Sequence, residues 1–114
     1  MPAFEMLYDD EEDALEVTFA TFDESFARTI PLNDQIVIYT DLSMRVAWGI
    51  TFYSYARLLE VSETYLDRLA PLPKEAAAPL LAVLFEPPLS AFLEPVDPDR
   101  LLARVKAPSI ADLV

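Results

Sequence analysis

Two short segments near the start of the chain alternate between hydrophobic and polar residues. Their hydrophobic members are Phe4, Met6, Tyr8, Leu15, Val17 and Phe19. A period of two residues is typical of strands that bury one face. The acidic run Asp9–Asp13 between them has the length of a hairpin connection, so the pattern predicts an antiparallel pair of strands.

Two further segments are hydrophobic on both faces. Ile36–Tyr39 and Arg45–Tyr53 predict a third and a fourth strand, joined by a turn at Thr40–Met44. Residues 26–32 form either an additional strand or the start of a longer third one. Strands with such short connections pair antiparallel, so we expect a meander. Strands that are hydrophobic on both faces need cover on both sides, from the C-terminal helices or from another copy of the sheet.

After residue 60 the spacing changes to that of short helices interrupted by proline. Ser62 is a candidate cap for a helix that buries Tyr65, Leu66 and Leu69, although the segment 55–59 also fits helical spacing and leaves its start open. A second helix is expected either to begin near residues 76–78, because Pro79 is tolerated in a first turn, or to be kinked at this proline. Its inward stripe is Ala77, Leu80, Leu81 and Leu84.

Asp97 and Pro98 together form the clearest helix start in the chain, an acceptor followed by proline. The buried stripe of this helix would be Leu101, Leu102 and Val105. One more turn over residues 108–114 would make a fourth helix. The sequence therefore predicts a single α+β domain over residues 1–114. An antiparallel meander of four to five strands (1–60) precedes three to four short helices (61–114) packed on one sheet face.

Composition narrows the chemistry. The 114 residues include 20 acidic and 8 basic side chains, one glycine (Gly49), no histidine and no cysteine. A histidine base, a cysteine nucleophile and a zinc site with the usual ligands are thereby excluded, as is a glycine-rich phosphate loop. We expect no catalytic residues, no metal site and no cofactor. The net charge of −12 repels nucleic acids and anionic membranes.

The hydrophobic content of 54% is above the usual value of about 45–50% for globular domains. Surplus hydrophobic surface is commonly covered by self-association, so we expect a homodimer. A basic protein is a second candidate partner, because residues 1–60 carry 12 acidic and 3 basic side chains. The sequence shows neither a signal peptide nor a long hydrophobic span, and the cytoplasm is the expected location.

Three groups of residues are candidates for function. The run Asp9–Asp13 is either a cation site or a solvated turn, and its spacing, which lacks the features of an EF-hand, favours the turn. A second group would form a pocket for a carboxylate or phosphate if its members converge, and otherwise consists of surface residues paired with local acids: Arg28, Arg45, Tyr55 and Arg57. A third group is either core or an interface: Trp48, Phe52, Leu81, Leu84 and Phe85.

Several short motifs resemble a small, mostly bacterial family known as domain of unknown function 2283. They are Tyr8-Asp9, Asp13-Ala14-Leu15 with Val17, Ile36-Val37-Ile38-Tyr39, Val46-Ala47-Trp48-Gly49-Ile50 and Ser54-Tyr55-Ala56-Arg57-Leu58. The resemblance covers residues 4–60, with Glu16 in place of a usual aromatic residue and a C-terminal region outside the family core. It implies a small antiparallel β module and supplies no catalytic residues.

These observations favour a non-enzymatic, acidic module for protein interaction and self-association. The alternative is a small-molecule binding or weakly catalytic domain that holds a carboxylate or phosphate with arginine and tyrosine side chains. The two hypotheses differ in whether those side chains converge in one pocket.

Overall fold

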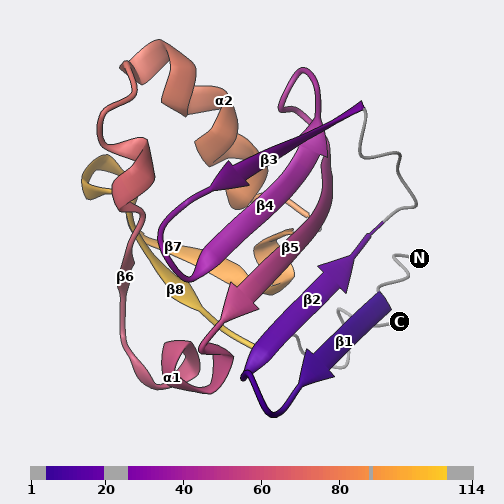
Figure 1. Ribbon diagram of the computed structural model, residues 1–114. Helices are drawn as coiled ribbons and strands as arrows, with labels where there is room; N and C mark the ends of the chain where they lie inside the picture. The colour runs from indigo at the N-terminus through magenta and orange to yellow at the C-terminus, as the bar shows by residue number, and fades with distance from the viewer. Residues whose placement is uncertain (1–4, 20–25, 88, 108–114) are drawn as a thin grey trace.

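Five strands form an antiparallel sheet in the computed structural model, which describes residues 5–19, 26–87 and 89–107 (Figure 1). They are β1 (Glu5–Asp9), β2 (Ala14–Thr18), β3 (Ala27–Pro31), β4 (Ile36–Asp41) and β5 (Ala47–Tyr53). Each lies in a segment where the sequence predicts a strand. The α+β class and the antiparallel sheet are therefore confirmed.

The spatial order of these strands is β1-β2-β5-β4-β3, which differs from the meander that the sequence predicts. The last of these five strands in the chain, β5, lies in the middle of the sheet, between the β1–β2 hairpin and the β3–β4 hairpin. Its hydrophobic residues explain this position: Phe52 lies opposite both Leu15 of β2 and Ile36 of β4. A central strand buries more of such a surface than an edge strand does, and the resulting arrangement of β2 to β5 is that of a Greek key.

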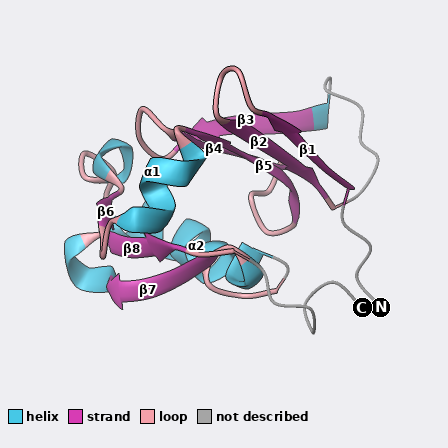
Figure 2. Ribbon diagram, turned by 90° about the horizontal axis from the view of Figure 1, so that it is seen from below, coloured by secondary structure: helices cyan, strands magenta, loops and turns pink. Residues whose placement is uncertain are grey.

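The C-terminal half combines helices with a second sheet, instead of being helical throughout. Its helices are α1 (Tyr55–Glu60), α2 (Lys74–Leu84) and the short 3₁₀ helices η2 (Asp67–Leu69), η3 (Leu89–Ala91) and η4 (Pro98–Arg100). Its strands, in the order β6-β8-β7, are β6 (Thr64–Tyr65), β7 (Leu93–Asp97) and β8 (Leu102–Val105). Figure 2 shows this half lying against one face of the five-stranded sheet.

Two of the helix predictions are wrong. No α-helix begins at Ser62, because Thr64 and Tyr65 extend and pair with β8, and only the 3₁₀ helix η2 forms in the rest of the predicted segment. The helix at Pro98 ends after three residues, since Leu101 adopts a left-handed conformation with φ of 59° and the chain then enters β8. Pairing between β7 and β8, which includes an ion pair of Glu94 with Arg104, replaces the predicted helical stripe.

The helix expected near residues 76–78 does form, but it begins earlier, at Lys74, and encloses Pro79. The open question at residues 55–62 is resolved in favour of the earlier segment, as α1. The possible turn over residues 108–114 lies outside the described residues. Among the described residues, neither α-helix has the length and hydrophobicity needed to cross a membrane.

The hydrophobic core lies between the five-stranded sheet and the C-terminal half. The rings of Phe52 and Phe92, one from each half, lie 6.1 Å apart, and both side chains are fully buried. The opposite face of the sheet bears no described helix or strand (Figure 2). On that outer face Val37 and Tyr39 are half-buried and Tyr53 is exposed.

Candidate functional site

Strand β1 is the most exposed strand among the described residues. All five of its residues are exposed, including Met6 (40%), Leu7 (70%) and Tyr8 (52%). Leu7 lies opposite Glu16 and on the outer face of the sheet, whereas Met6 and Tyr8 share the inner face with buried residues of β2. Three neighbouring hydrophobic side chains are thus accessible on both faces of an edge strand.

The register of the sheet shows which backbone groups of β1 remain available. Phe19 donates its N–H to Trp48 O, so alternate residues of β2, Leu15 and Val17 among them, form their hydrogen bonds with β5. The intervening residues of β2 form their backbone hydrogen bonds with β1, and their partners there are Glu5, Leu7 and Asp9. The N–H and C=O groups of Met6 and Tyr8 therefore point away from the sheet, and no described strand pairs with them.

The acidic turn after β1 uses its carboxylates to hold the chain. Asp9 Oδ1 accepts hydrogen bonds from Glu11 N (3.0 Å) and Glu12 N (3.3 Å). Asp13 accepts the hydroxyl proton of Tyr8 (2.6 Å), and both of its carboxylate oxygens lie 3.1 Å from Ala56 N. Within the described residues no group of three or more potential metal ligands is arranged around a common point. The geometry is that of a structural turn.

Asp13 also fastens the hairpin to α1. Its backbone carbonyl accepts the N–H of Tyr55 (3.0 Å), so the first residues of α1 find acceptors on a distant turn. The usual capping position, Ser54, has φ of 56° and makes no side-chain cap, which leaves this task to Asp13. The same carboxylate raises the pKa of Tyr8 above its ordinary value, chiefly by accepting its hydroxyl hydrogen.

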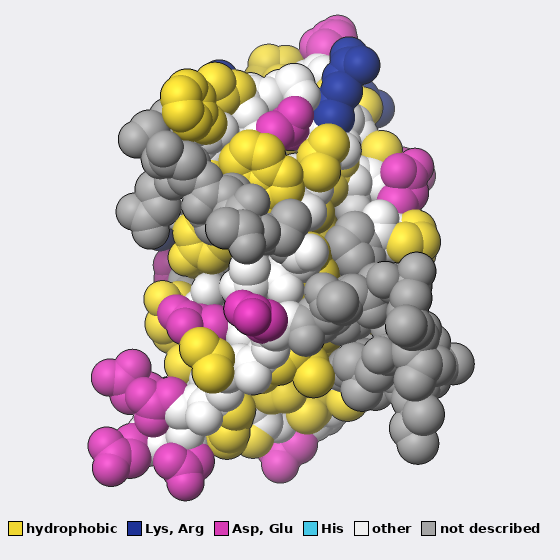
Figure 3. All heavy atoms as spheres, turned by 90° about the vertical axis from the view of Figure 1, so that its right-hand side faces the viewer, with side chains coloured by type: hydrophobic (Ala, Val, Ile, Leu, Met, Phe, Trp, Pro, Cys, Tyr) yellow, Lys and Arg dark blue, Asp and Glu magenta, His cyan; other side chains and the backbone are white. Residues whose placement is uncertain are grey.

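Charge is distributed unevenly around the exposed hydrophobic residues. The outer faces of β1 and β2 carry Glu5, Asp9 and Glu16, and none of the described strands places a lysine or arginine on that face of the sheet. Figure 3, which faces the β1 side of the molecule, shows acidic side chains gathered at its lower end, where the turn lies, with hydrophobic surface above them. We call β1 together with Glu16 the open flank.

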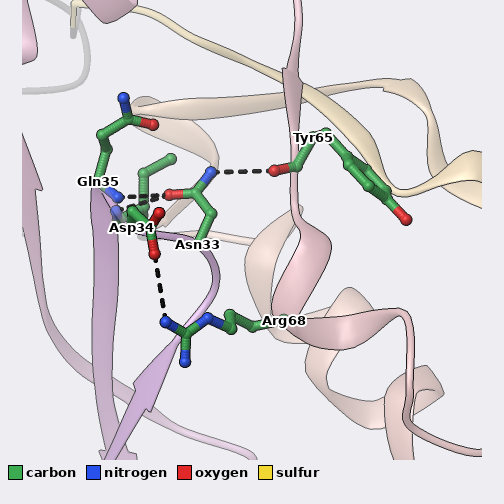
Figure 4. A network of polar contacts seen from close by, with 6 residues as sticks. Asn33, Asp34, Gln35, Tyr65 and Arg68 are labelled. Atoms are coloured by element: carbon green, nitrogen blue, oxygen red, sulfur yellow. Dashed lines mark hydrogen bonds and ion pairs between the residues drawn. The ribbon is translucent and has the colours of Figure 1, made fainter.

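A polar groove of about 370 Å³ lies at the same end of the sheet, between the β3–β4 turn, α1 and β6. Asn33 occupies its base and is buried. Its side-chain oxygen accepts hydrogen bonds from Gln35 N (2.8 Å) and Ile36 N (2.9 Å), and its amide nitrogen donates to Tyr65 O (3.1 Å), as Figure 4 shows. The side-chain oxygen of Asn33 thus holds the β3–β4 turn, and its amide nitrogen joins that turn to β6.

The rim of this groove is mainly acidic. Asp34 pairs with Arg68 at 3.2 Å, and both side chains are largely exposed. Glu63 and Asp67 also line the groove, and Arg57 is its one basic lining residue. Three carboxylates oppose the binding of an anion there.

The four residues proposed to bind an anion lie in two pairs at opposite ends of β5. Arg28 Nε donates to Leu42 O (2.9 Å), and Arg45 donates its backbone N–H to Asp41, both beside the β4–β5 turn. That turn also holds the pKa of Asp41 below its ordinary value, chiefly through a hydrogen bond from Ser43. The structure does not bring the four together in one pocket.

The other pair lies at the start of α1. Burial raises the pKa of Tyr55, whose ring packs against Phe52 with centroids 5.3 Å apart. Its hydroxyl donates to Lys106 O at 3.5 Å. Arg57 is exposed in the polar groove. Tyr55 therefore serves packing, and Arg57 is the only member of the set that lines this groove.

The proposed interface residues also separate. Phe52 and Leu84 are fully buried and belong to the core, so the interface interpretation is wrong for these two residues, which offer no surface to a partner chain. Trp48, Leu81 and Phe85 are half-buried. Sequence reasoning missed the exposure of Met6 and Leu7, since β1 reads as an ordinary strand with one buried face. It also missed Asn33 and Asp13, for which the nearest signal was a polar residue beside each expected turn.

Comparisons with known proteins give no further guidance: no protein-family model, curated protein or solved structure matches this chain. The resemblance to domain of unknown function 2283 rests on the short motifs alone. Function must therefore be argued from the geometry.

Proposed function

We propose that this chain is a non-enzymatic protein-interaction module that binds other polypeptides through the open flank. The observation that carries the proposal is the exposure of every residue of β1, with hydrophobic side chains on both faces and backbone groups directed away from the sheet. An exposed edge strand of this kind is a template for pairing with another chain.

The chemistry of the chain supports binding more than catalysis. The sequence contains neither histidine nor cysteine, so a histidine base and a cysteine nucleophile are both missing from it. Exposed hydrophobic residues flanked by acidic ones are instead suited to contact with protein.

Two kinds of partner agree with this surface. A second copy of the chain would cover hydrophobic residues on both molecules, as the composition leads us to expect. A basic protein would in addition neutralise Glu5, Asp9 and Glu16. Either partner would be recognised mainly through backbone pairing, with side chains adding selectivity.

Selection from a random peptide library, with the chain immobilised, tests this function for partners of any sequence. We expect the selection to yield peptides that bind the chain. When they are added to the ¹⁵N-labelled chain, the NMR shift changes should map to β1 and β2. The Leu7→Lys variant should lose them. Leu72→Lys is the matched control, because Leu72 is exposed but lies outside the open flank. Sedimentation velocity at tens of micromolar measures self-association in parallel. A strictly monomeric chain whose binders all map elsewhere would contradict the proposal.

A further inference from the structure

We infer that the open flank takes an extended peptide segment with a basic residue at each end and three hydrophobic residues between them. The segment adds to β1 as a further strand of the five-stranded sheet. This inference rests on the proposed function and specifies the partner's chemistry. It follows from the backbone pattern of β1, from the side chains on its two faces and from the distribution of charge.

The backbone of β1 sets the geometry of the added strand. The N–H and C=O groups of Met6 and Tyr8 point outward, whereas those of Glu5, Leu7 and Asp9 are used by β2. An antiparallel strand would exchange hydrogen bonds with Met6 and with Tyr8, and would place one residue opposite Leu7 between them. Five residues of the added strand therefore lie opposite the five residues of β1.

The side chains of β1 define what each of those five positions prefers. The three central positions face Met6, Leu7 and Tyr8, all of which are exposed and hydrophobic. The outer two face Glu5 and Asp9, which lie on the same face of the sheet as Glu16. Cross-strand pairs are favourable when hydrophobic residues meet or when opposite charges meet. The complementary segment is thus basic at its ends and hydrophobic in its middle.

The same charges disfavour a second copy of this chain. The antiparallel register that uses all the outward groups pairs Met6 of one copy with Tyr8 of the other. It also places Glu5 directly opposite Asp9, on both sides of the pair. Like charges directly opposite each other are destabilising. The flank therefore selects a basic segment of another protein over its own copy.

The other edge strand of this sheet does not offer a comparable site. Leu32 donates its N–H to Ile36 O, so by alternation the next outward backbone position of β3 is Pro31. Proline has no N–H to donate, and such residues protect edge strands. Arg28, on the same strand, would also repel a basic segment.

NMR titration of the ¹⁵N-labelled chain with defined peptides tests the inference. The probe is acetyl-Lys-Val-Ile-Val-Lys-amide, and its charge-reversed counterpart is acetyl-Glu-Val-Ile-Val-Glu-amide. We expect saturable shift changes at β1 and β2 and an affinity for the lysine peptide about tenfold higher, because each end exchanges an attractive pair for a repulsive one. Methylating the backbone nitrogens of both valines should abolish binding, since these donate to β1.

Charge reversal on the chain separates pairing with β1 from general attraction to an acidic protein. Glu5→Lys should abolish most of the preference for the lysine peptide, whereas Glu86→Lys, with the same change of net charge at an exposed position away from the flank, should preserve it. A preference that survives Glu5→Lys, or binding that survives backbone methylation, overturns the inference. If library peptides bind at β1 without basic ends, the inference fails and the proposed function stands. If none binds there, the inference fails, and the proposed function fails with it when the chain is also strictly monomeric.

Discussion

Two hairpins flank the central strand β5, and they differ in how completely they are built into the fold. In the β3–β4 hairpin, Ile36 and Ile38 are fully buried, and the edge is protected by Pro31. In the β1–β2 hairpin, the whole of β1 is exposed and contains no proline. The edge strand β3 is thus partly buried, with Ile30 packed against the core, whereas the edge strand β1 is available for association without loss of core packing.

Both hairpins are fastened to the C-terminal half at their turns, by different chemistry. Buried Asn33 joins the β3–β4 turn to β6 through a neutral amide that makes three hydrogen bonds. Partly exposed Asp13 joins the β1–β2 turn to α1 through a carboxylate. A buried group loses more free energy than a solvated one when its partner is removed. We therefore expect the two links to differ in strength.

The largest effect is expected for Asn33→Ala. The substitution leaves the N–H groups of Gln35 and Ile36 and the carbonyl of Tyr65 without their partner, and should lower the free energy of unfolding by about 3 kcal/mol. Chemical denaturation measures this loss. Asp34→Ala is the control, since its ion pair with Arg68 is exposed and worth less than about 1 kcal/mol. Equal losses in the two variants would contradict the role of Asn33.

A smaller loss is expected for Asp13→Ala. This change removes the acceptor for Ala56 N and for the Tyr8 hydroxyl, and should cost about 1–2 kcal/mol, the usual value for a helix cap. Asp10→Ala, in the same acidic turn, should change the stability by less than about 0.5 kcal/mol. If Asp10→Ala proved as costly, the turn would act through its total charge instead of through Asp13.

The exposed edge should be nearly neutral for stability. Leu7→Ser is expected to change the free energy of unfolding by less than about 0.5 kcal/mol, because the side chain is 70% exposed. Ile30→Ser, at the opposite edge, should cost about 1 kcal/mol, since Ile30 packs against the core. Chemical denaturation of both variants measures the two changes in the free energy of unfolding. A larger loss for Leu7 would mean that β1 is held by its own side chains.

The strands of the five-stranded sheet could be predicted because their pattern is local. Alternation at Leu15 and Val17, and the hydrophobic run before Tyr39, each identify a strand without reference to the rest of the chain. Their order could not be predicted in this way. The position of β5 depends on matching Phe52 with residues of two separate hairpins, and no local pattern records which strands meet.

The C-terminal half was harder to predict because its hydrophobic spacing fits two structures. Leu101, Leu102 and Val105 suit a helix, yet Ala103 and Val105 alternate as in a strand, and the left-handed residue Leu101 decides between them. For the candidate site, the sequence identified the acidic turn and its structural character. The openness of β1 depends on how far the C-terminal half extends over the sheet, which only the tertiary structure shows.

The smallest effect concerns the charged link of the β1–β2 hairpin. The pKa of Tyr8 is raised above 10.0 in the folded chain, mainly by its hydrogen bond to Asp13. This bond therefore stabilises the fold below pH 10, and its contribution is lost as the pH rises through the raised pKa. A ¹³C NMR titration of the Tyr8 ring should give a lower pKa in Asp13→Asn, and a smaller decrease in Asp10→Asn, whose charge acts from farther away. Because Asn33 does not titrate, the β1–β2 turn should loosen before the β3–β4 turn as the pH rises above 10, and hydrogen exchange measures this order. Simultaneous loosening would show that the two hairpins open as one unit.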